Sequence, residues 1–212
     1  MAERVPAGRA GRLWLSARIA GARRSLELLD RKRQLLRREH ERLARHRLET
    51  AEEWARSCAA AEEWALRAAV LGGTAALTPT GDETTGRGQV EITWRSTMGV
   101  RHPAEAHCIL PKLAPTVAAA ANAAVAPAAA AHRRALEAAA THAAVECSFA
   151  AIDAELSATD QRVRAIEHRR LPALEETLRS LELHLDELER EERVVSRWAR
   201  ERLGRPTEVS GL

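Results

Sequence analysis

The chain has 212 residues, of which 30% are charged and only 3% are aromatic, and it is rich in Ala, Leu, Glu and Arg. These four residues favour helices, and so little aromatic bulk is unlike the core of an ordinary globular domain. The formal net charge of +3, from 33 basic and 30 acidic residues, argues against a strong polyanion-binding protein.

The three cysteines show no CxxC spacing, which is typical of free thiols in a reducing compartment. The arginines near the N-terminus are followed by no apolar core segment, so we expect no signal peptide. The longest apolar stretches are Ala-rich and interrupted by Asn122 and Pro127. We therefore expect no transmembrane helix.

Residues 11–70 predict one long helix, because the segment lacks proline and its apolar residues recur at heptad spacing. One of the two apolar heptad positions becomes polar halfway, at Arg33, His40 and Arg47. We interpret His40 as a register-setting polar residue rather than a proton switch. The predicted seam of this segment consists of Leu15, Ile19, Ala22, Leu26, Leu29, Leu36 and Leu43.

Residues 71–127 break the helical pattern with several glycines and prolines and predict a small separate module. Residues 89–97 alternate, with Val90, Ile92 and Trp94 on one side, which predicts a strand. We expect a second strand near 106–110, which would complete a small hairpin or sheet.

Residues 128–203 predict a second long helix, since Pro127 suits a helix start and a strong heptad pattern begins at Leu171. Pro172 lies inside this pattern and is expected to kink the helix or to mark a local restart. Residues 204–212 are expected to form a flexible tail. The predicted seam of this segment consists of Leu171, Leu174, Leu178, Leu181, Leu185, Leu188 and Val195.

The two helical arms can fold back on each other and bury their apolar stripes. Residues 1–70 have a net charge of +6 and residues 128–212 a net charge of −3, which favours pairing, although an exposed ion pair contributes under about 1 kcal/mol. Burial of the seam must dominate, at about 25 cal/mol per Å² of apolar area. The expected fold is mainly α, a long antiparallel two-helix coiled coil with a small β-hairpin and loop module in the middle of the chain.

The motifs of common enzyme classes are absent from the sequence. Neither Lys32 nor Lys112 follows a glycine, as a P-loop requires, and GxSxG, HExxH and GxGxxG do not occur. No histidine has a glutamate three residues before it, as di-metal carboxylate bundles require. We therefore expect a protein that is not an enzyme, with no catalytic residue, cofactor or metal.

Two weaker constellations have simple structural interpretations. His142, Glu146 and Cys147 lie close together, but three ligands from one helix make poor zinc geometry. The basic cluster at 31–38 could bind nucleic acid, but acidic residues flank it on both sides. A solvated helix face is the favoured interpretation.

Three short motifs follow one another near the C-terminus: Arg-Val-x-Ala-x-Glu at 162–167, Leu-Pro at 171–172 and Leu-Asp-Glu-x-Glu-Arg-Glu at 185–191. The segment 22–33, with Leu-Leu at 28–29 and Arg-Lys-Arg at 31–33, adds a fourth. Together they resemble the D-subunit family of V-type rotary ATPases, over both helical arms. Arg164 replaces the family's Asn, Ser25 its usual Gly and Asp30 its usual Lys.

The resemblance implies a non-catalytic central-stalk subunit, a rotor shaft that couples ATP hydrolysis or synthesis in a catalytic ring to ion translocation. The implied partners are a ring of A- and B-type subunits, a companion rotor protein (the F subunit) and a membrane-ring cap subunit of C/d type. The implied location is the cytoplasmic face of the membrane, with no direct membrane insertion and no nucleic acid. Two alternatives stay open: a coiled-coil scaffold or nucleic-acid-associated structural protein, and a helical-bundle enzyme.

Both termini lie together in an antiparallel pair, and by the resemblance this end enters the catalytic ring. The candidate ring-contacting residues are Arg4, Arg9, Arg12, Leu13, Leu15, Trp198, Arg200, Arg202 and Leu203. The companion F subunit is expected to contact residues near 31–50 and 150–175.

Overall fold

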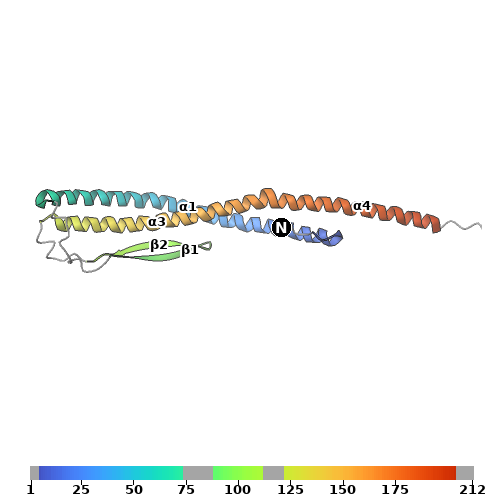
Figure 1. Cartoon of the computed structure of the whole chain (residues 1–212), viewed down its shortest axis with the longest axis horizontal. Helices are drawn as coiled ribbons and strands as arrows, with labels where there is room; N and C mark the ends of the chain where they lie inside the picture. The colour runs from blue at the N-terminus through green and yellow to red at the C-terminus, as the bar shows by residue number, and fades with distance from the viewer. Residues whose placement is uncertain (1–4, 74–87, 112–121, 204–212) are drawn as a thin grey trace, which may run out of the picture. The chain divides into compact units, whose positions relative to one another are not determined.

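The computed structural model describes residues 5–73, 88–111 and 122–203. Its elements are α1 (Gly8–Gly72), β1 (Gln89–Thr97), β2 (Val100–Ile109), α3 (Val125–Ala165), the π-helical turn η2 (Ile166–Arg170) and α4 (Leu171–Leu203) (Figure 1). The fold is mainly helical with a two-stranded antiparallel hairpin in the middle of the chain, as predicted. The predicted tail at 204–212 lies outside the described residues.

The chain divides into two compact units. The central unit contains residues 32–159, and the terminal unit contains the described residues up to Arg31 together with those from Asp160 onward. Each unit holds a part of α1 and the helical segment that packs against it, so each is described by itself.

In the central unit, α1 and α3 run antiparallel side by side (Figure 1). Their cross-helix pairs show this directly, because the partner number on α3 falls as the number on α1 rises. From one end to the other, these pairs are Lys32–Glu155, Arg47–Glu146, Thr50–His142, Ala61–Ala131 and Ala68–Ala124.

Two kinds of apolar layer hold the central unit together. Leu36, Leu43 and Ile152 form one buried cluster, with Phe149 and Leu156 packed against it. Further along, the layers are built from alanine, which lets the two backbones approach closely. The alanine layers are Ala61 with Ala131 and Ala135, and Ala68 with Ala124 and Ala128.

In the terminal unit, the first residues of α1 pack against the end of α3 and against α4. Leu15, Ile19, Ala22 and Val163 are buried. A Cβ on Gly11 would lie 2.0 Å from the Pro6 carbonyl oxygen and 3.2 Å from Leu181 Cδ2, so only glycine fits there without rearrangement.

The α4 side of the seam is shorter than predicted. Leu171, Leu174, Leu178, Leu181 and Leu185 are half-buried. The last two predicted members are exposed instead, Leu188 at 42% and Val195 at 66%. The physical reason is that α1 begins only at Gly8, and Gly11 already lies beside Leu181, so the C-terminal part of α4 extends beyond its partner helix.

The heptad spacing is interrupted once, at the junction of α3 and α4. Val163 is followed on the same seam by Leu171, eight rather than seven positions later. The π-helical turn Ile166–Arg170 lies in this interval, and the Leu171 N–H donates to the Ile166 carbonyl five residues earlier. Such a turn absorbs one extra residue. The expected kink or restart at Pro172 therefore takes the form of a wider turn directly before the proline, which has no N–H to donate.

The ends of the paired helices in the central unit are closed by local chemistry. Gly73 has a φ of +70°, the left-handed conformation that commonly terminates a helix. At the start of α3, Asn122 Oδ1 accepts a 2.9 Å hydrogen bond from the Ala124 N–H. Asn122 Nδ2 donates to the Ala68 carbonyl of α1 at 3.1 Å. This one side chain thus ties the two helix ends together.

The hairpin turns at Met98-Gly99, which both have positive φ, 51° and 85°. Two left-handed residues in a two-residue loop make a type I′ turn. The first strand matches the prediction, but the second begins at Val100 rather than near 106. It continues through Pro103 because a β-bulge beside that residue relieves the missing N–H.

The bulge also changes which residues of β1 lie opposite the buried side of β2. The buried residues of β2 are His102 and Ala106, and they pair with Arg95 and Ile92. These partners are three positions apart, whereas His102 and Ala106 are four apart, because the extra residue of the bulge lies in β2.

Side chains of α3 and β2 fix the hairpin beside α3 (Figure 1). The Arg133 guanidinium donates to the Leu110 carbonyl at 2.8 Å and to the Pro111 carbonyl. Cys108 Sγ lies 3.7 Å from the Leu136 carbonyl, and the Ser148 hydroxyl donates to the Pro103 carbonyl. The hairpin is therefore anchored along most of β2.

Candidate functional site

The N-terminal ring-contact candidates differ in exposure. Arg9 and Leu13 are exposed, Leu13 at 70%, and Arg12 is exposed as well. Arg9 Nη2 lies 3.0 Å from Glu189 Oε1 of α4. Leu15 is fully buried and therefore belongs to the seam rather than to an outer surface.

On α4, the candidates Trp198, Arg200 and Arg202 are exposed, Trp198 at 65%. Val194 and Val195, which were not among the contact candidates, are exposed at 57% and 66%. Two exposed valines and a tryptophan close together on one helix form an apolar patch of the kind that marks an interaction surface. The exposed C-terminal part of α4, residues 190–203, is thus an apolar and basic surface, which we call the α4 end. Arg4 and the Leu203 side chain lie outside the described residues.

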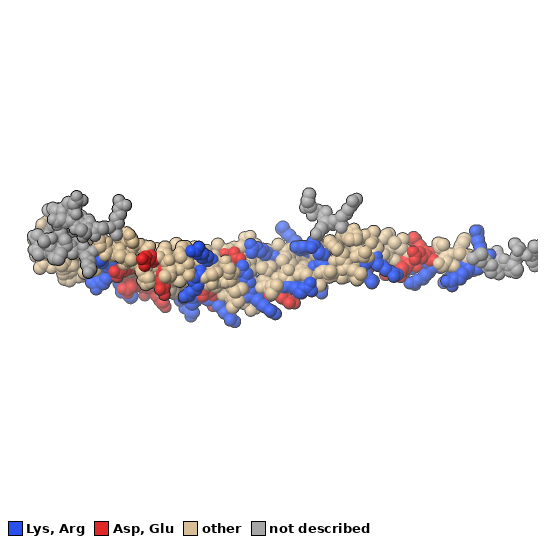
Figure 2. Space-filling view, turned by 90° about the horizontal axis from the view of Figure 1, so that it is seen from below, with Lys and Arg blue, Asp and Glu red and all other residues tan. Residues whose placement is uncertain are grey.

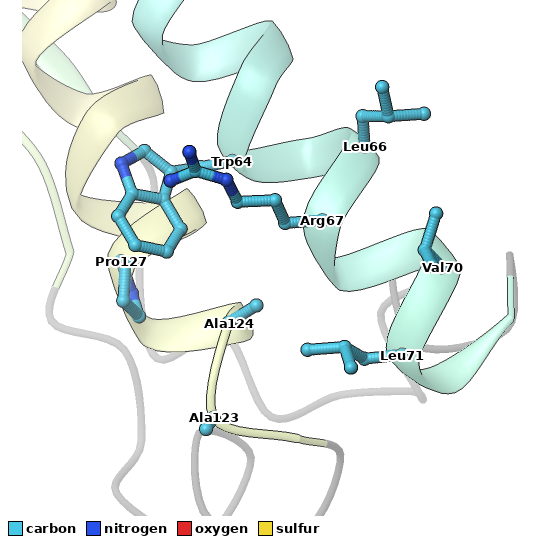
Figure 3. Close-up of a pocket in the computed structure, with 8 residues that line it drawn as sticks. All are labelled: Trp64, Leu66, Arg67, Val70, Leu71, Ala123, Ala124 and Pro127. Atoms are coloured by element: carbon cyan, nitrogen blue, oxygen red, sulfur yellow. The ribbon is translucent and has the colours of Figure 1, made fainter.

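A second candidate surface lies in the central unit, where α1 ends and α3 begins. It is an apolar groove with a volume of about 610 Å³. Figure 3 shows Val70 and Leu71 of α1, Ala124 just before α3 and Pro127 of α3 around it. The Arg67 guanidinium lies 4.6 Å from the Trp64 ring centroid. The full lining is Trp64, Leu66, Arg67, Val70, Leu71, Ala123, Ala124 and Pro127.

Charged side chains of both signs are interleaved along the helices (Figure 2). Many pair across or along α1, as Lys32 does with Glu155 at 2.6 Å. The Arg42 guanidinium donates two hydrogen bonds to Glu39, at 2.7 and 3.0 Å, which lowers the pKa of that carboxyl, although partial burial opposes the shift. Arg95 and His102 of the hairpin lower it further.

The suspected metal constellation on α3 has other partners. His142 Nδ1 lies 3.0 Å from the Thr50 hydroxyl of α1, and Glu146 pairs with Arg47 at 3.3 Å. Cys147 is exposed. Among the described residues, no group of three or more His, Cys, Asp or Glu side chains is placed to hold a metal ion. His142 and Glu146 serve the contact between the helices, and His142 Nε2 also lies 3.7 Å from Glu146 Oε1.

No helix in the described part of the chain is long and apolar enough to cross a bilayer. A scan of protein families matches residues 13–201 to the family of the ATP synthase D subunit. A search of the curated proteins found no match. The matched range includes α1 from residue 13 onward, the hairpin, α3, and α4 up to residue 201.

Proposed function

The chain belongs to the ATP synthase D-subunit family, which is the D-subunit family of V-type ATPases, and on this premise we propose that it is the central rotor shaft of such a complex. Family membership makes it a stalk subunit that associates with other subunits of an ATP synthase or ATPase. The proposal goes further, to a V-type complex in which the shaft couples ATP turnover to ion translocation. The observation that carries it is the family match over residues 13–201.

In this proposal the chain performs no bond-making or bond-breaking chemistry. ATP is turned over in a surrounding ring of A- and B-type subunits, and the shaft makes the ring's sites unequal as it turns. This role requires a stiff helix pair with well-packed layers rather than an active site. The buried Leu36, Leu43 and Ile152 cluster supports such stiffness.

We assign the α4 end to the catalytic ring. Val194, Val195 and Trp198 are exposed apolar side chains beyond the part of α4 that α1 covers, and Arg200 and Arg202 follow them. An apolar helix end of this kind suits a close-fitting sleeve, because burial in the sleeve would remove its valines and tryptophan from water.

The other partners are assigned to surfaces away from the α4 end. The apolar groove at Trp64, Leu71 and Pro127 of the central unit would contact the membrane-ring cap subunit. The companion F subunit would contact α1 near 31–50 and the segment 150–175, which runs from α3 through η2 into α4. The complex would lie at the cytoplasmic face of the membrane, held there by its partners.

The test is affinity purification of the tagged full-length chain from membranes of its host. Co-purification of A- and B-type subunits is expected, whereas recovery without any ATPase subunit would contradict the proposal. Replacing Val195 and Trp198 by serine should reduce recovery of the ring subunits several-fold. Trp94→Ser, at a tryptophan of β1 that is similarly exposed (51%), is the matched control and should leave recovery unchanged.

Site-specific crosslinking tests the assigned polarity separately. Photocrosslinkers at Leu13 and at Trp198 should join the chain to ring subunits. Crosslinks to the ring from the hairpin, and none from these two positions, would reverse the assignment of the ends.

A further inference from the structure

From the leucine cluster toward the alanine layers, the seam of the central unit also contains polar and aromatic side chains. Eight side chains face one another there across the two helices, and we call them the cross-helix ladder. They are His40, Arg47, Thr50 and Trp54 of α1, and His142, Glu146, Phe149 and Asp153 of α3.

At one end of the ladder, Thr50 and His142 form a buried polar layer. Thr50 is 9% exposed, and its hydroxyl lies 3.0 Å from His142 Nδ1. The same hydroxyl lies 3.0 Å from the His46 carbonyl and 3.2 Å from the Arg47 carbonyl. The Trp54 ring stacks on His142, with centroids 5.5 Å apart. In this arrangement the Nδ1 of His142 has a hydrogen-bond partner in Thr50, and its ring face has a stacking partner in Trp54.

At the other end, charged groups alternate with rings. Arg47 Nε lies 3.3 Å from Glu146 Oε1, and its guanidinium lies 4.6 Å from the Phe149 ring centroid. The Phe149 ring lies 4.5 Å from the His40 ring. His40 Nε2 lies 3.1 Å from Asp153 Oδ1. Each of these contacts joins unlike groups across the helix pair.

The apolar seam by itself does not distinguish one axial register from the next. Ala61 and Ala68 are seven residues apart on α1, and Ala124, directly before α3, is followed at intervals of seven by Ala131 and Ala138 on α3. A slip of one heptad would again place alanine opposite alanine. In the same slip Leu43 would meet Leu156, so the leucine layer would keep an apolar pair, although Ile152 would lose its contact with Leu36.

The ladder would not survive that slip. Thr50 would face Phe149, and His142 would face Ser57, so the buried hydroxyl–imidazole contact and the Trp54 stack would both be lost. The Thr50 hydroxyl would keep its contacts to the His46 and Arg47 carbonyls of its own helix, so the cost falls on the His142 ring, whose Nδ1 would lose its partner. A buried polar group without a partner costs about 1–3 kcal/mol. Polar residues in a coiled-coil seam are known to set register at some cost in stability.

We propose that the cross-helix ladder fixes the register of α1 against α3 in the central unit. The ladder selects this register over a slip of one heptad, in which the alanine and leucine layers would still pair apolar side chains. This inference concerns the chain alone and does not depend on its place in an ATPase.

The experiment measures register in the full-length chain by electron–electron spin-label distances. One label is attached to the exposed native Cys147 of α3 and the other to Glu62→Cys on α1, in a background with Cys58→Ala and Cys108→Ser. The two sites are staggered along the helix axis, so a slip of one heptad shifts them by about 10 Å along it. The unmodified ladder should give a single narrow distance distribution.

The decisive variant is Thr50→Val with His142→Leu, which replaces the polar layer by apolar side chains of similar size. The midpoint of thermal unfolding should stay the same or rise, while a second distance population appears. A single unchanged distribution in a folded variant would overturn the proposal. Thr177→Val with His184→Leu makes the same chemical change at exposed positions of α4 and should leave the distribution unchanged.

A second variant keeps the question answerable if the first does not fold. His142→Gln retains a polar group that can meet the Thr50 hydroxyl, so it should preserve the single distribution. Broadening with His142→Gln as well would show that the polar contact is not what selects the register, and would overturn the proposal.

Discussion

Single residues in this chain stabilise it in two ways, by burying apolar side chains and by pairing charges. Leu36 and Ile152 are 0% exposed and contribute burial. Glu39 illustrates the smaller contribution of charge. It accepts two hydrogen bonds from Arg42, three residues later on the same helix. Pairs of this kind stabilise a helix by about 0.2–0.5 kcal/mol.

The Glu39–Arg42 pair predicts a pH-dependent effect. Since the pair lowers the pKa of Glu39 in the folded chain, its contribution is present above the ordinary carboxyl pKa and is lost as pH falls through the lowered value. Glu39→Gln should lower the free energy of unfolding by about 0.5 kcal/mol at pH 7, and the difference should vanish once the pH lies below the lowered pKa of Glu39. Urea unfolding measured as a function of pH checks this.

Glu41→Gln, at an exposed glutamate two positions away, is the control for Glu39. A loss of the same size in this control, or an effect of Glu39→Gln that persists in acid, would show that the Arg42 pair is not the cause.

At the residue scale the sequence predicts burial where periodicity is strict and misses it elsewhere. Leu15, Leu36 and Leu43 follow from heptad spacing alone and are buried. His102, 1% exposed, could not be found in this way, because its burial depends on the hairpin lying against the α1–α3 pair. Its ring is satisfied by the Thr97 hydroxyl and the Pro103 carbonyl, both within the hairpin.

At the scale of elements, the hairpin turn contains a local conflict. Met98 has a φ of 51°, which is unfavourable for a residue with a long side chain, whereas Gly99 at 85° is suited to its position. Asn-Gly is the preferred pair for a type I′ turn.

Met98→Asn should therefore stabilise the hairpin, by about 0.5–1 kcal/mol. Because Met98 is exposed at 42%, little burial is lost with it. The measurement is hydrogen exchange of the β1 and β2 amides, which should slow in the variant. Gly99→Ala should have the opposite effect, and faster exchange with Met98→Asn would contradict the turn assignment.

The π-helical turn gives the second prediction at this scale. One residue too many lies between Val163 and Leu171, and Pro172 follows. Deleting His168 together with Pro172→Ala should restore continuous α-helix with the seam intact, so that thermal stability is retained. Deleting His168 alone should lower the free energy of unfolding by about 3 kcal/mol or more, because Pro172 would then lie in the interior of a regular helix.

Thermal unfolding compares these two variants, and a crystal structure of the double change shows the turn. Pro172→Ala alone is the control and should keep the π turn, since the extra residue remains. If the two deletion variants were equally stable, Pro172 would not be the reason that the chain needs the π turn.

The sequence predicts α1, β1 and the presence of a second α-helical arm, because each has a clear period of its own. It does not predict where β2 begins. Pro103 argues against a strand, and only the bulge and the Ser148 contact explain how the strand accommodates it. The skip of one residue before Leu171 can be read from the sequence, but a π turn is one of several ways to absorb it.

For the whole molecule, each unit combines a strongly packed segment with one that is left open to partners. In the central unit these are the leucine cluster and the apolar groove. In the terminal unit the packed segment contains the buried side chains of Leu15, Ile19, Ala22 and Val163, and the open segment is the α4 end. The sequence suggested Val195 as a seam residue because it continues the heptad. Periodicity cannot tell whether the surface that covers a stripe belongs to the same chain.

This distinction leads to a prediction about truncation. Residues 190–203 of α4 make little contact with α1, since every described side chain there is exposed. Ending the chain after Glu189, which keeps the Arg9–Glu189 pair, should change the midpoint of thermal unfolding by no more than a few degrees. The same truncation should abolish co-purification of the ring subunits. Removing only residues 204–212 is the control. A truncated chain that still recovers the ring would mean that the α4 end is covered by some other partner, and that the ring contact lies elsewhere on the chain.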